Sequence, residues 1–284
     1  LAVADIRRAA DAFQPIYAAT RGVDGYVSLE VSPRLASDTA RTLTEARRLW
    51  RAVDRPNLMI KVPGTLESVP VVRALIAEGI NVNITLLFAR CAYLAVAEAY
   101  LQGLEDRVTR GERIDQIASV ASFFISRIDT VMDAAIAAQG AAASPLMSRV
   151  AIANAKLAYQ DFLALTQSSR WQALAAKGAQ PQRLLWASTG TKNPALRDTL
   201  YVEQLIGPHT VNTVPPATLT VPATLLAALG PLFVKVTVPV TVLPAVALVG
   251  TLSVTLTSAR LLIAVVPLAV LLARLLSGVV VVAT

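Results

Sequence analysis

Short apolar runs rich in branched residues alternate along the chain with longer segments of helical period. The runs are GYVSLEV (25–31), NLMIKV (57–62), INVNITLLF (80–88), IASVASFFI (117–125), RLLWAST (183–189) and HTVNTV (209–214). Nearly continuous apolar runs of this length are typical of strands that are buried on both faces, as in a parallel sheet. The pattern therefore predicts parallel strands separated by helices.

The segments between these runs have apolar residues at helical spacing. They are residues 37–53, 66–78, 89–107, about 127–139, about 146–177 and 195–206, and residues 1–17 form a further amphipathic helix that lacks the features of a signal peptide. In the first of these segments, Ser37 and Asp38 supply a side chain that can cap the helix.

Repeated strand–helix units are compatible with two architectures. A doubly wound sheet usually carries a glycine-rich phosphate loop after a strand, and the chain contains neither G-x-G-x-x-G nor a P-loop motif. A closed barrel instead collects polar groups at the carboxyl ends of several strands. We therefore predict an α/β fold, an incomplete (β/α)8 TIM barrel with six of its eight strands, as if earlier β/α units were missing.

Isolated polar residues lie within or just after the predicted strands. They are Glu30, Lys61, Asn81, Asn83, Thr85, Ser119, Ser122 and Ser188. A lysine amine attacks a carbonyl carbon only when it is neutral, and burial favours the neutral form. Lys61, with Glu30 on the preceding strand and Thr85 on the next, is therefore a candidate Schiff-base nucleophile. A buried Lys61–Glu30 ion pair with a purely structural role explains the same spacing equally well.

Two further clusters follow strands. Ser122 and Arg127 could bind a phosphate through a hydroxyl and a guanidinium fork, unless Arg127 instead pairs with Asp129 or Asp133 at the start of its helix. The small polar loop of residues 188–192 could bind an anion or could form only a turn.

Composition excludes several classes of protein. The chain has 284 residues and a net charge of +7, but its cations are scattered beside acidic residues, which argues against nucleic-acid binding. One cysteine, Cys91, excludes an internal disulfide framework and fits a reducing, cytoplasmic setting; we expect it to be a buried structural thiol. His209 is the only histidine, so histidine-based metal motifs are absent, and we expect it to end an element.

Seven segments, in their order and spacing, resemble the transaldolase family, specifically the longer bacterial type. They are DGYVSLEVSP, NLMIKVPGT, EGINVNITLLF, ASVASFFISRID, ANAKLAYQDF, LLWASTGTKNP and HTVNTVPPATL, and the resemblance covers residues 1 to about 219. It implies a (β/α)8 barrel without metal or organic cofactor, acting in the pentose phosphate pathway of carbohydrate metabolism. The implied reaction transfers a dihydroxyacetone unit from sedoheptulose 7-phosphate to glyceraldehyde 3-phosphate, so sugar phosphates are the implied partners. Another lysine-dependent aldolase on the same barrel is the alternative enzyme.

The resemblance also implies a role for individual residues. Lys61 would form the Schiff base, and Glu30 with Thr85 would hold the water that relays protons. The remaining residues would contact substrate: Asn83 the sugar chain, Ser122 and Arg127 the phosphate, and Phe124 and Ser188 the wall of the pocket.

The resemblance departs from the family at both ends. Family members begin with two β/α units that supply an aspartate acid/base and an asparagine, and neither residue has a counterpart in this chain. Loss of a positioned proton-transfer group costs about 10²–10⁴-fold in rate, so we expect the chain as written to be weakly active or inactive.

The residues after the last motif differ in composition from all that precede them. All 19 acidic residues lie at or before Glu203, and residues 217–284 form an apolar, low-complexity tail, whereas residues 1–216 form the transaldolase-like domain. We interpret the tail as out-of-frame or chimeric translation. The alternative is a non-catalytic barrel remnant tethered to a membrane through residues 261–284, although Pro267 and Arg274 oppose a membrane span.

Overall fold

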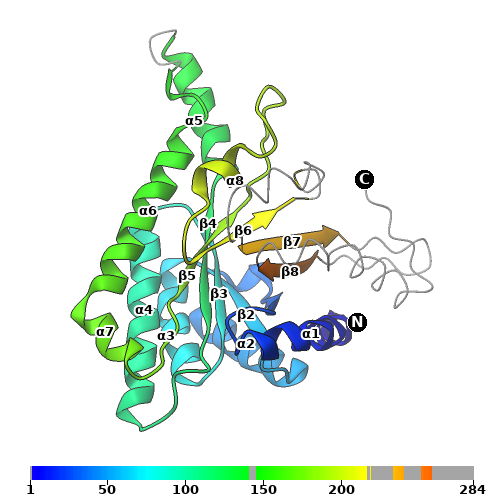
Figure 1. Ribbon diagram of the computed structural model, residues 1–284, viewed down its shortest axis with the longest axis vertical. Coiled ribbons are helices and arrows are strands. Elements are labelled where there is room, and N and C mark those ends of the chain that lie inside the picture. The colour runs from blue at the N-terminus through cyan, green and yellow to red at the C-terminus, as the bar shows by residue number, and fades with distance from the viewer. Residues whose placement is uncertain (1, 141–144, 216–217, 219–232, 240–250, 258–284) are drawn as a thin grey trace, which may run out of the picture.

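Six short strands run parallel and in chain order through the centre of the molecule (Figure 1). The computed structural model describes residues 2–140, 145–215, 218, 233–239 and 251–257. The strands are β1 (Val27–Glu30), β2 (Leu58–Pro63), β3 (Val82–Leu87), β4 (Ser119–Phe124), β5 (Arg183–Ala187) and β6 (Thr210–Val214). Each strand pairs in parallel with the next, and the sheet curls as an incomplete TIM barrel does. All six predicted strands and the predicted fold class are confirmed.

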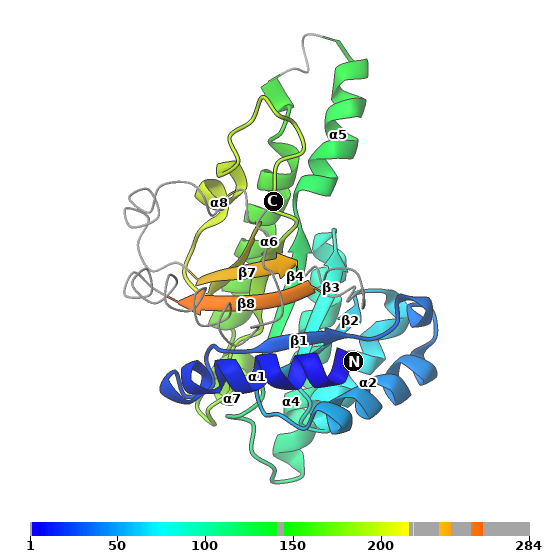
Figure 2. The ribbon, with the colours of Figure 1, turned by 90° about the vertical axis from the view of Figure 1, so that its right-hand side faces the viewer.

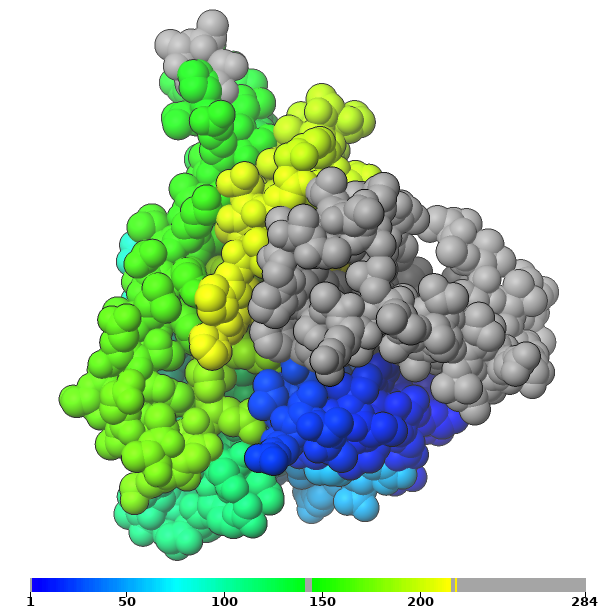
Figure 3. All heavy atoms as spheres, viewed as in Figure 1, coloured from blue at the N-terminus to red at the C-terminus, as the bar shows by residue number. Residues whose placement is uncertain are grey.

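The helices occupy the segments that have helical period. They are α1 (Ala2–Ala19), α2 (Thr39–Val53), α3 (Val69–Ala77), α4 (Arg90–Thr109), α5 (Ser126–Ala138), α6 (Val150–Gln167), α7 (Ser169–Ala175) and α8 (Leu200–Leu205), with short 3-10 turns at Pro33–Leu35 and Leu66–Ser68. Asp38 caps α2 as predicted, because its carboxylate accepts from the Arg41 amide at 2.9 Å. In the space-filling view α5 projects beyond the rest of the described molecule (Figure 3).

The segment predicted to be helical at about 146–177 contains two helices. Residues 146–177 form not one helix but α6 followed by α7, separated at Ser168. Ser168 has an extended backbone, and its hydroxyl accepts a hydrogen bond from the Trp171 amide at 3.2 Å. A serine that caps the following helix in this way offers the backbone an alternative to continuing the first helix.

The sheet has two differently filled faces. Its outer face packs against the helices, and residues such as Ile60, Ile84 and Phe123 belong to that large core. Its inner face, toward the barrel axis, has a separate apolar cluster contributed by the strands and the residues next to them: Tyr26, Met59, Ala118, Val120, Phe124, Leu185, Ala187 and Val211. Because side chains alternate between faces along a strand, residues two apart from these also point inward. This geometry places the polar side chains of the site.

Two additional strands extend the sheet. β7 (Phe233–Pro239) pairs in parallel with β6, and β8 (Thr251–Thr257) pairs antiparallel with β7. β8 lies beside β1, so the sheet curls back toward its first strand (Figure 2). An antiparallel last strand differs from the all-parallel arrangement of a (β/α)8 barrel.

Most of the predicted apolar tail, including the proposed span at 261–284, lies outside the described residues. None of the helices in the described part of the chain has both the length and the hydrophobicity that a membrane span requires.

The prediction of a buried Cys91 is wrong, because this thiol is exposed. Cys91 is the second residue of α4, whose buried face carries Tyr93, Val96 and Tyr100. At about 100° per residue, Cys91 lies roughly 140–200° around the helix from these three residues. His209, as predicted, lies at the end of an element, immediately before β6, with a left-handed φ of 58°.

Candidate active site

Three of the predicted site residues lie side by side on adjacent strands. Glu30 is in register with Lys61, and Lys61 is in register with Asn83. Residues in register on parallel strands present their side chains to the same face of the sheet. Glu30 is the last residue of β1, Lys61 lies in the second half of β2 and Asn83 is the second residue of β3, so the three form a row across the sheet.

Lys61 and Glu30 form an ion pair. The Nζ–Oε2 distance is 3.0 Å, and the side chains are 26% and 42% exposed. β2, which carries Lys61, is an interior strand between β1 and β3, but the side chain of Lys61 is still partly exposed to solvent. The predicted ion pair therefore forms, but it is partly exposed and not buried. A carboxylate in direct contact with an amine is also within reach to accept its proton.

Asn83 is the centre of a buried hydrogen-bond network. Its Nδ2 donates to Ser28 Oγ at 3.1 Å, and its Oδ1 accepts from Ser122 Oγ at 2.7 Å. Asn83 is 1% exposed and Ser122 is 2% exposed. The network spans β1, β3 and β4 and fixes the orientation of the amide. Because a hydroxyl has one hydrogen to donate, the Ser122 hydroxyl is engaged by Asn83 in this arrangement.

Thr85 is buried near the end of β3, next to an irregularity of the strand. The register with β4 shifts between Ile84 and Leu87, and Leu86 has a left-handed φ of 62°. An extra residue in a strand bends it and changes the direction of the side chains that follow. A non-glycine residue in this conformation costs about 1–3 kcal/mol and tends to occur at functional sites.

Arg127 is exposed at the start of α5 and lies over an aromatic ring. Its guanidinium carbon is 5.1 Å from the centroid of the Phe124 ring. Neither of the ion pairs considered for Arg127 forms among the described residues. Asp129 instead accepts from Tyr201 and from the Ala151 amide. Asp133 accepts from Ser148 through both of its oxygens.

The loop after β5 is tied to the start of α5. The Ser126 amide donates to the carbonyl of Ser188 at 3.0 Å, and the two hydroxyl groups are 2.9 Å apart. Ser188 has a left-handed φ of 56°. This contact places the polar loop that begins at Ser188 next to the residue that precedes Arg127. The hydroxyl of Thr189, which is buried, donates to the carbonyl of Thr213.

Two of the isolated polar residues do not belong to this site. Asn81 donates to the carbonyls of Pro56 and Leu58, and Ser119 donates to the carbonyl of Val82. Both lie at or before the amino-terminal ends of their strands. Their contacts join neighbouring strands, so their role is structural.

Comparisons with known proteins identify the family. The family model for transaldolase/fructose-6-phosphate aldolase matches residues 1–224. The chain belongs to this family. It is 54% identical to the transaldolase of Trichodesmium erythraeum over 224 residues, which are 76% of this chain and 59% of that relative. It is 56% identical to the transaldolase of Thermobifida fusca over 218 residues, 76% of this chain and 59% of that relative.

A further relative is named transaldolase 2, from Nostoc sp., and is 53% identical over 230 residues, 78% of this chain and 60% of the relative. The chain thus spans about three-fifths of the length of the curated relatives it matches. The family resemblance read from the sequence is confirmed.

Two polar residues that contact the predicted site residues were not among those predicted from the sequence. Ser28 lies two residues before Glu30 on β1, so strand alternation alone places both on the inner face. Ser126 lies between the predicted strand and the predicted helix, and no sequence pattern indicates a role for it. Its contact with Ser188 is seen only in the structure.

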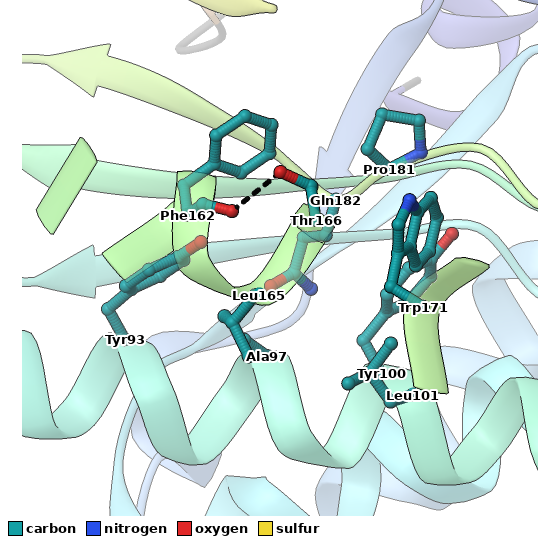
Figure 4. A pocket seen from close by; sticks show the side chains of 10 residues that line it. All are labelled: Tyr93, Ala97, Tyr100, Leu101, Phe162, Leu165, Thr166, Trp171, Pro181 and Gln182. Carbon is teal, nitrogen blue, oxygen red and sulfur yellow. Dashed lines mark hydrogen bonds between the residues drawn. The ribbon is translucent and has the colours of Figure 1, made fainter. Parts of the chain in front are cut away.

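A cavity of about 20 Å³ lies elsewhere, among the helices of the outer layer (Figure 4). It is lined by Tyr93, Ala97, Tyr100, Leu101, Phe162, Leu165, Thr166, Trp171, Pro181 and Gln182. This volume is close to that of a single water molecule and is too small for a sugar phosphate. None of the predicted site residues lines this cavity.

Proposed function

We propose that this chain carries the Schiff-base site of a transaldolase. The observation that carries the proposal is the row formed by Glu30, Lys61 and Asn83, with the Lys61 amine 3.0 Å from a carboxylate. The family to which the chain belongs supports it. The substrate, the reaction and the role of every residue below are part of the proposal, because the chain spans about three-fifths of its relatives.

The amine of Lys61 adds to the C2 carbonyl of a ketose phosphate, and loss of water gives an imine. Glu30 accepts the amine proton and, with Thr85, holds the water molecule that moves protons. The water held by Glu30 and Thr85 then takes the proton of the C4 hydroxyl and passes it to the Glu30 carboxylate as the C3–C4 bond breaks. The electron pair of that bond moves into the iminium to give an enamine, and an aldose phosphate departs.

The enamine then attacks the aldehyde carbon of the acceptor, which forms a new carbon–carbon bond. Water hydrolyses the resulting imine and frees Lys61. With sedoheptulose 7-phosphate as donor and glyceraldehyde 3-phosphate as acceptor, the products are erythrose 4-phosphate and fructose 6-phosphate. The chemistry needs no metal or organic cofactor, since the iminium nitrogen is the electron sink.

The other site residues bind substrate. Asn83, whose amide is fixed by Ser28 and Ser122, hydrogen-bonds the sugar chain. Arg127 and Ser122 bind the phosphate, with the greater part carried by Arg127 because the Ser122 hydroxyl already donates to Asn83. Phe124 and Ser188 line the pocket. The single cysteine supports a cytoplasmic location.

Borohydride reduction tests the nucleophile. With fructose 6-phosphate present, reduction is expected to leave on Lys61 the three-carbon dihydroxyacetone unit that remains after glyceraldehyde 3-phosphate departs. Peptide mass mapping detects this adduct, and Lys61→Met is expected to abolish it. Lys156, an exposed lysine on α6, is the control position, because Lys156→Met is expected to leave the adduct unchanged. An adduct that survives Lys61→Met would contradict the proposal.

A second assay separates transaldolase from the other aldolase that the family description includes. Transfer from fructose 6-phosphate to erythrose 4-phosphate, giving sedoheptulose 7-phosphate, is expected to be faster than cleavage of fructose 6-phosphate alone. Cleavage that erythrose 4-phosphate does not accelerate would favour an aldolase over a transaldolase.

A further inference from the structure

Phe88 reaches the inner face of the sheet because β3 carries an extra residue. Ile84 and Leu87 both belong to the helix-side core, although they are three positions apart. Strict alternation from Ile84 would also direct Phe88 toward the helices. The register shift and the left-handed Leu86 interrupt that alternation, so Phe88 lies instead on the opposite side from Leu87.

On that side Phe88 contacts the aromatic ring that lies under Arg127. The centroids of the Phe88 and Phe124 rings are 5.2 Å apart, at an interplanar angle of 41°. The guanidinium of Arg127 is 5.1 Å from the Phe124 centroid. Phe88, Phe124 and Arg127 therefore form a continuous stack that runs from the end of β3 to the start of α5. Phe124 is 9% exposed and Phe88 is 39% exposed, so Phe88 is the outer support of the stack.

Helix α6 holds the backbone on which Phe88 lies. Asn154 Nδ2 donates to the carbonyl of Phe88 at 2.9 Å. Two residues further on, Arg90 makes two hydrogen bonds of 2.7 Å to the carboxylate of Asp161, also on α6. Asn154 and Asp161 both come from the segment ANAKLAYQDF, for which the catalytic chemistry gives no role. These contacts fix the connection from β3 to α4 at Phe88 and at Arg90, the first residue of α4.

We propose that Phe88, anchored by Asn154, is a positioning residue that sets the guanidinium of Arg127 through the ring of Phe124. The inference rests on the proposed function, in which Arg127 binds the substrate phosphate. An edge or tilted ring contact limits the rotation of Phe124, and a ring of fixed orientation offers one face to the cation. Removal of Phe88 therefore loosens Arg127 without removing any group that touches the substrate.

The first measurement follows Arg127 directly and needs no activity. In the NMR spectrum of the parent chain, the Nε–H proton of Arg127 is expected to be shielded by the Phe124 ring. Phe88→Ala is expected to lose that shielding, and Phe88→Tyr, which keeps a ring in place, is expected to restore it. Leu157→Ala is the matched control, because Leu157 is a half-exposed side chain on α6 outside the stack.

The second measurement separates phosphate binding from imine chemistry. Phe88→Ala is expected to raise the concentration of fructose 6-phosphate that gives half-maximal borohydride trapping by about five- to tenfold. The corresponding concentration of dihydroxyacetone, which has no phosphate, is expected to stay the same. Arg127→Ala gives the full effect of losing the guanidinium.

The outcomes distinguish the two proposals. A parent chain that traps neither ligand refutes the proposed function, and the Arg127 resonance then decides the positioning role alone. A Phe88→Ala chain that keeps the shielded resonance refutes the positioning role. Equal changes for fructose 6-phosphate and dihydroxyacetone also refute it, because a general disturbance of the site would affect both ligands.

Discussion

Replacement of Glu30 by Gln removes the negative charge beside Lys61 and leaves the size and shape of the side chain almost unchanged. The amide can still accept a hydrogen bond from Lys61, but it cannot accept a proton at neutral pH. Both side chains of the pair are partly exposed, at 26% and 42%. An ion pair with this exposure contributes about 0–1 kcal/mol, so the free energy of unfolding is expected to change by less than about 1 kcal/mol.

The effect on chemistry is expected to be much larger. A positioned acid/base contributes about 10²–10⁴-fold to the rate, which corresponds to about 3–5 kcal/mol of activation free energy. The rate at which borohydride-trapped adduct accumulates on Lys61 is therefore expected to fall at least about 100-fold in Glu30→Gln.

Glu78→Gln is the matched control for both measurements. Glu78 pairs with Arg47 at the surface, and these side chains are 36% and 39% exposed, so the same charge change occurs at similar exposure. Urea unfolding followed by circular dichroism measures the stability of both variants. The reasoning fails if Glu30→Gln accumulates adduct within about twofold of the parent rate, because the carboxylate would then have only the structural role in its ion pair.

Three further changes test the fold and the site. Burial raises the pKa of Asp129, so the native state binds this proton more tightly than the unfolded state does. The free energy of unfolding is therefore expected to fall as pH rises from about 4 through the raised pKa. Asp129→Asn should flatten this slope, as urea unfolding at several pH values measures. A Cβ on Gly103 would lie 2.7 Å from Ile76 Cβ, where α4 packs against α3. Gly103→Ala should therefore lower the free energy of unfolding by about 1–3 kcal/mol. Ala153→Ser, at an exposed position of α6, is the control and should leave the free energy of unfolding unchanged. Ser122→Ala should weaken trapping of both dihydroxyacetone and fructose 6-phosphate, because it removes the hydrogen bond that orients the Asn83 amide. An effect on fructose 6-phosphate alone would mean that Ser122 acts only on the phosphate.

The strands and the central residues of the site follow from the sequence because strand periodicity is local. Runs of branched apolar residues predict the strands, and single polar residues within them stand out. That Glu30, Lys61 and Asn83 are adjacent follows once the strands are known to be parallel and in chain order. The spacing of Lys61 and Glu30 also predicts their ion pair, which the structure contains at 3.0 Å.

Other features depend on contacts that no local pattern records. The separation of α6 from α7 depends on one serine that caps forward instead of continuing the helix. Cys91 is exposed because of its angular position on α4, which the average hydrophobicity of the segment hides. The inward position of Phe88 depends on a bulge at Leu86, and a leucine in the left-handed region has no sequence signal.

The buried asparagines on β3 and just before it explain why polar residues in similar strand runs have different roles. Asn81 bonds to backbone groups at the amino-terminal end: it donates to two carbonyls and accepts from the Ala118 amide. Substituting it would leave buried backbone groups unpaired, which costs about 1–3 kcal/mol for each group. Asn83, two residues later, bonds to the side chains of Ser28 and Ser122. Hydroxyl groups can rotate toward a new acceptor, so this network can exchange a bond for one to substrate without breaking the sheet. The side-chain network around Asn83, and not the backbone contacts of Asn81, is therefore the part of this strand at which a ligand can bind.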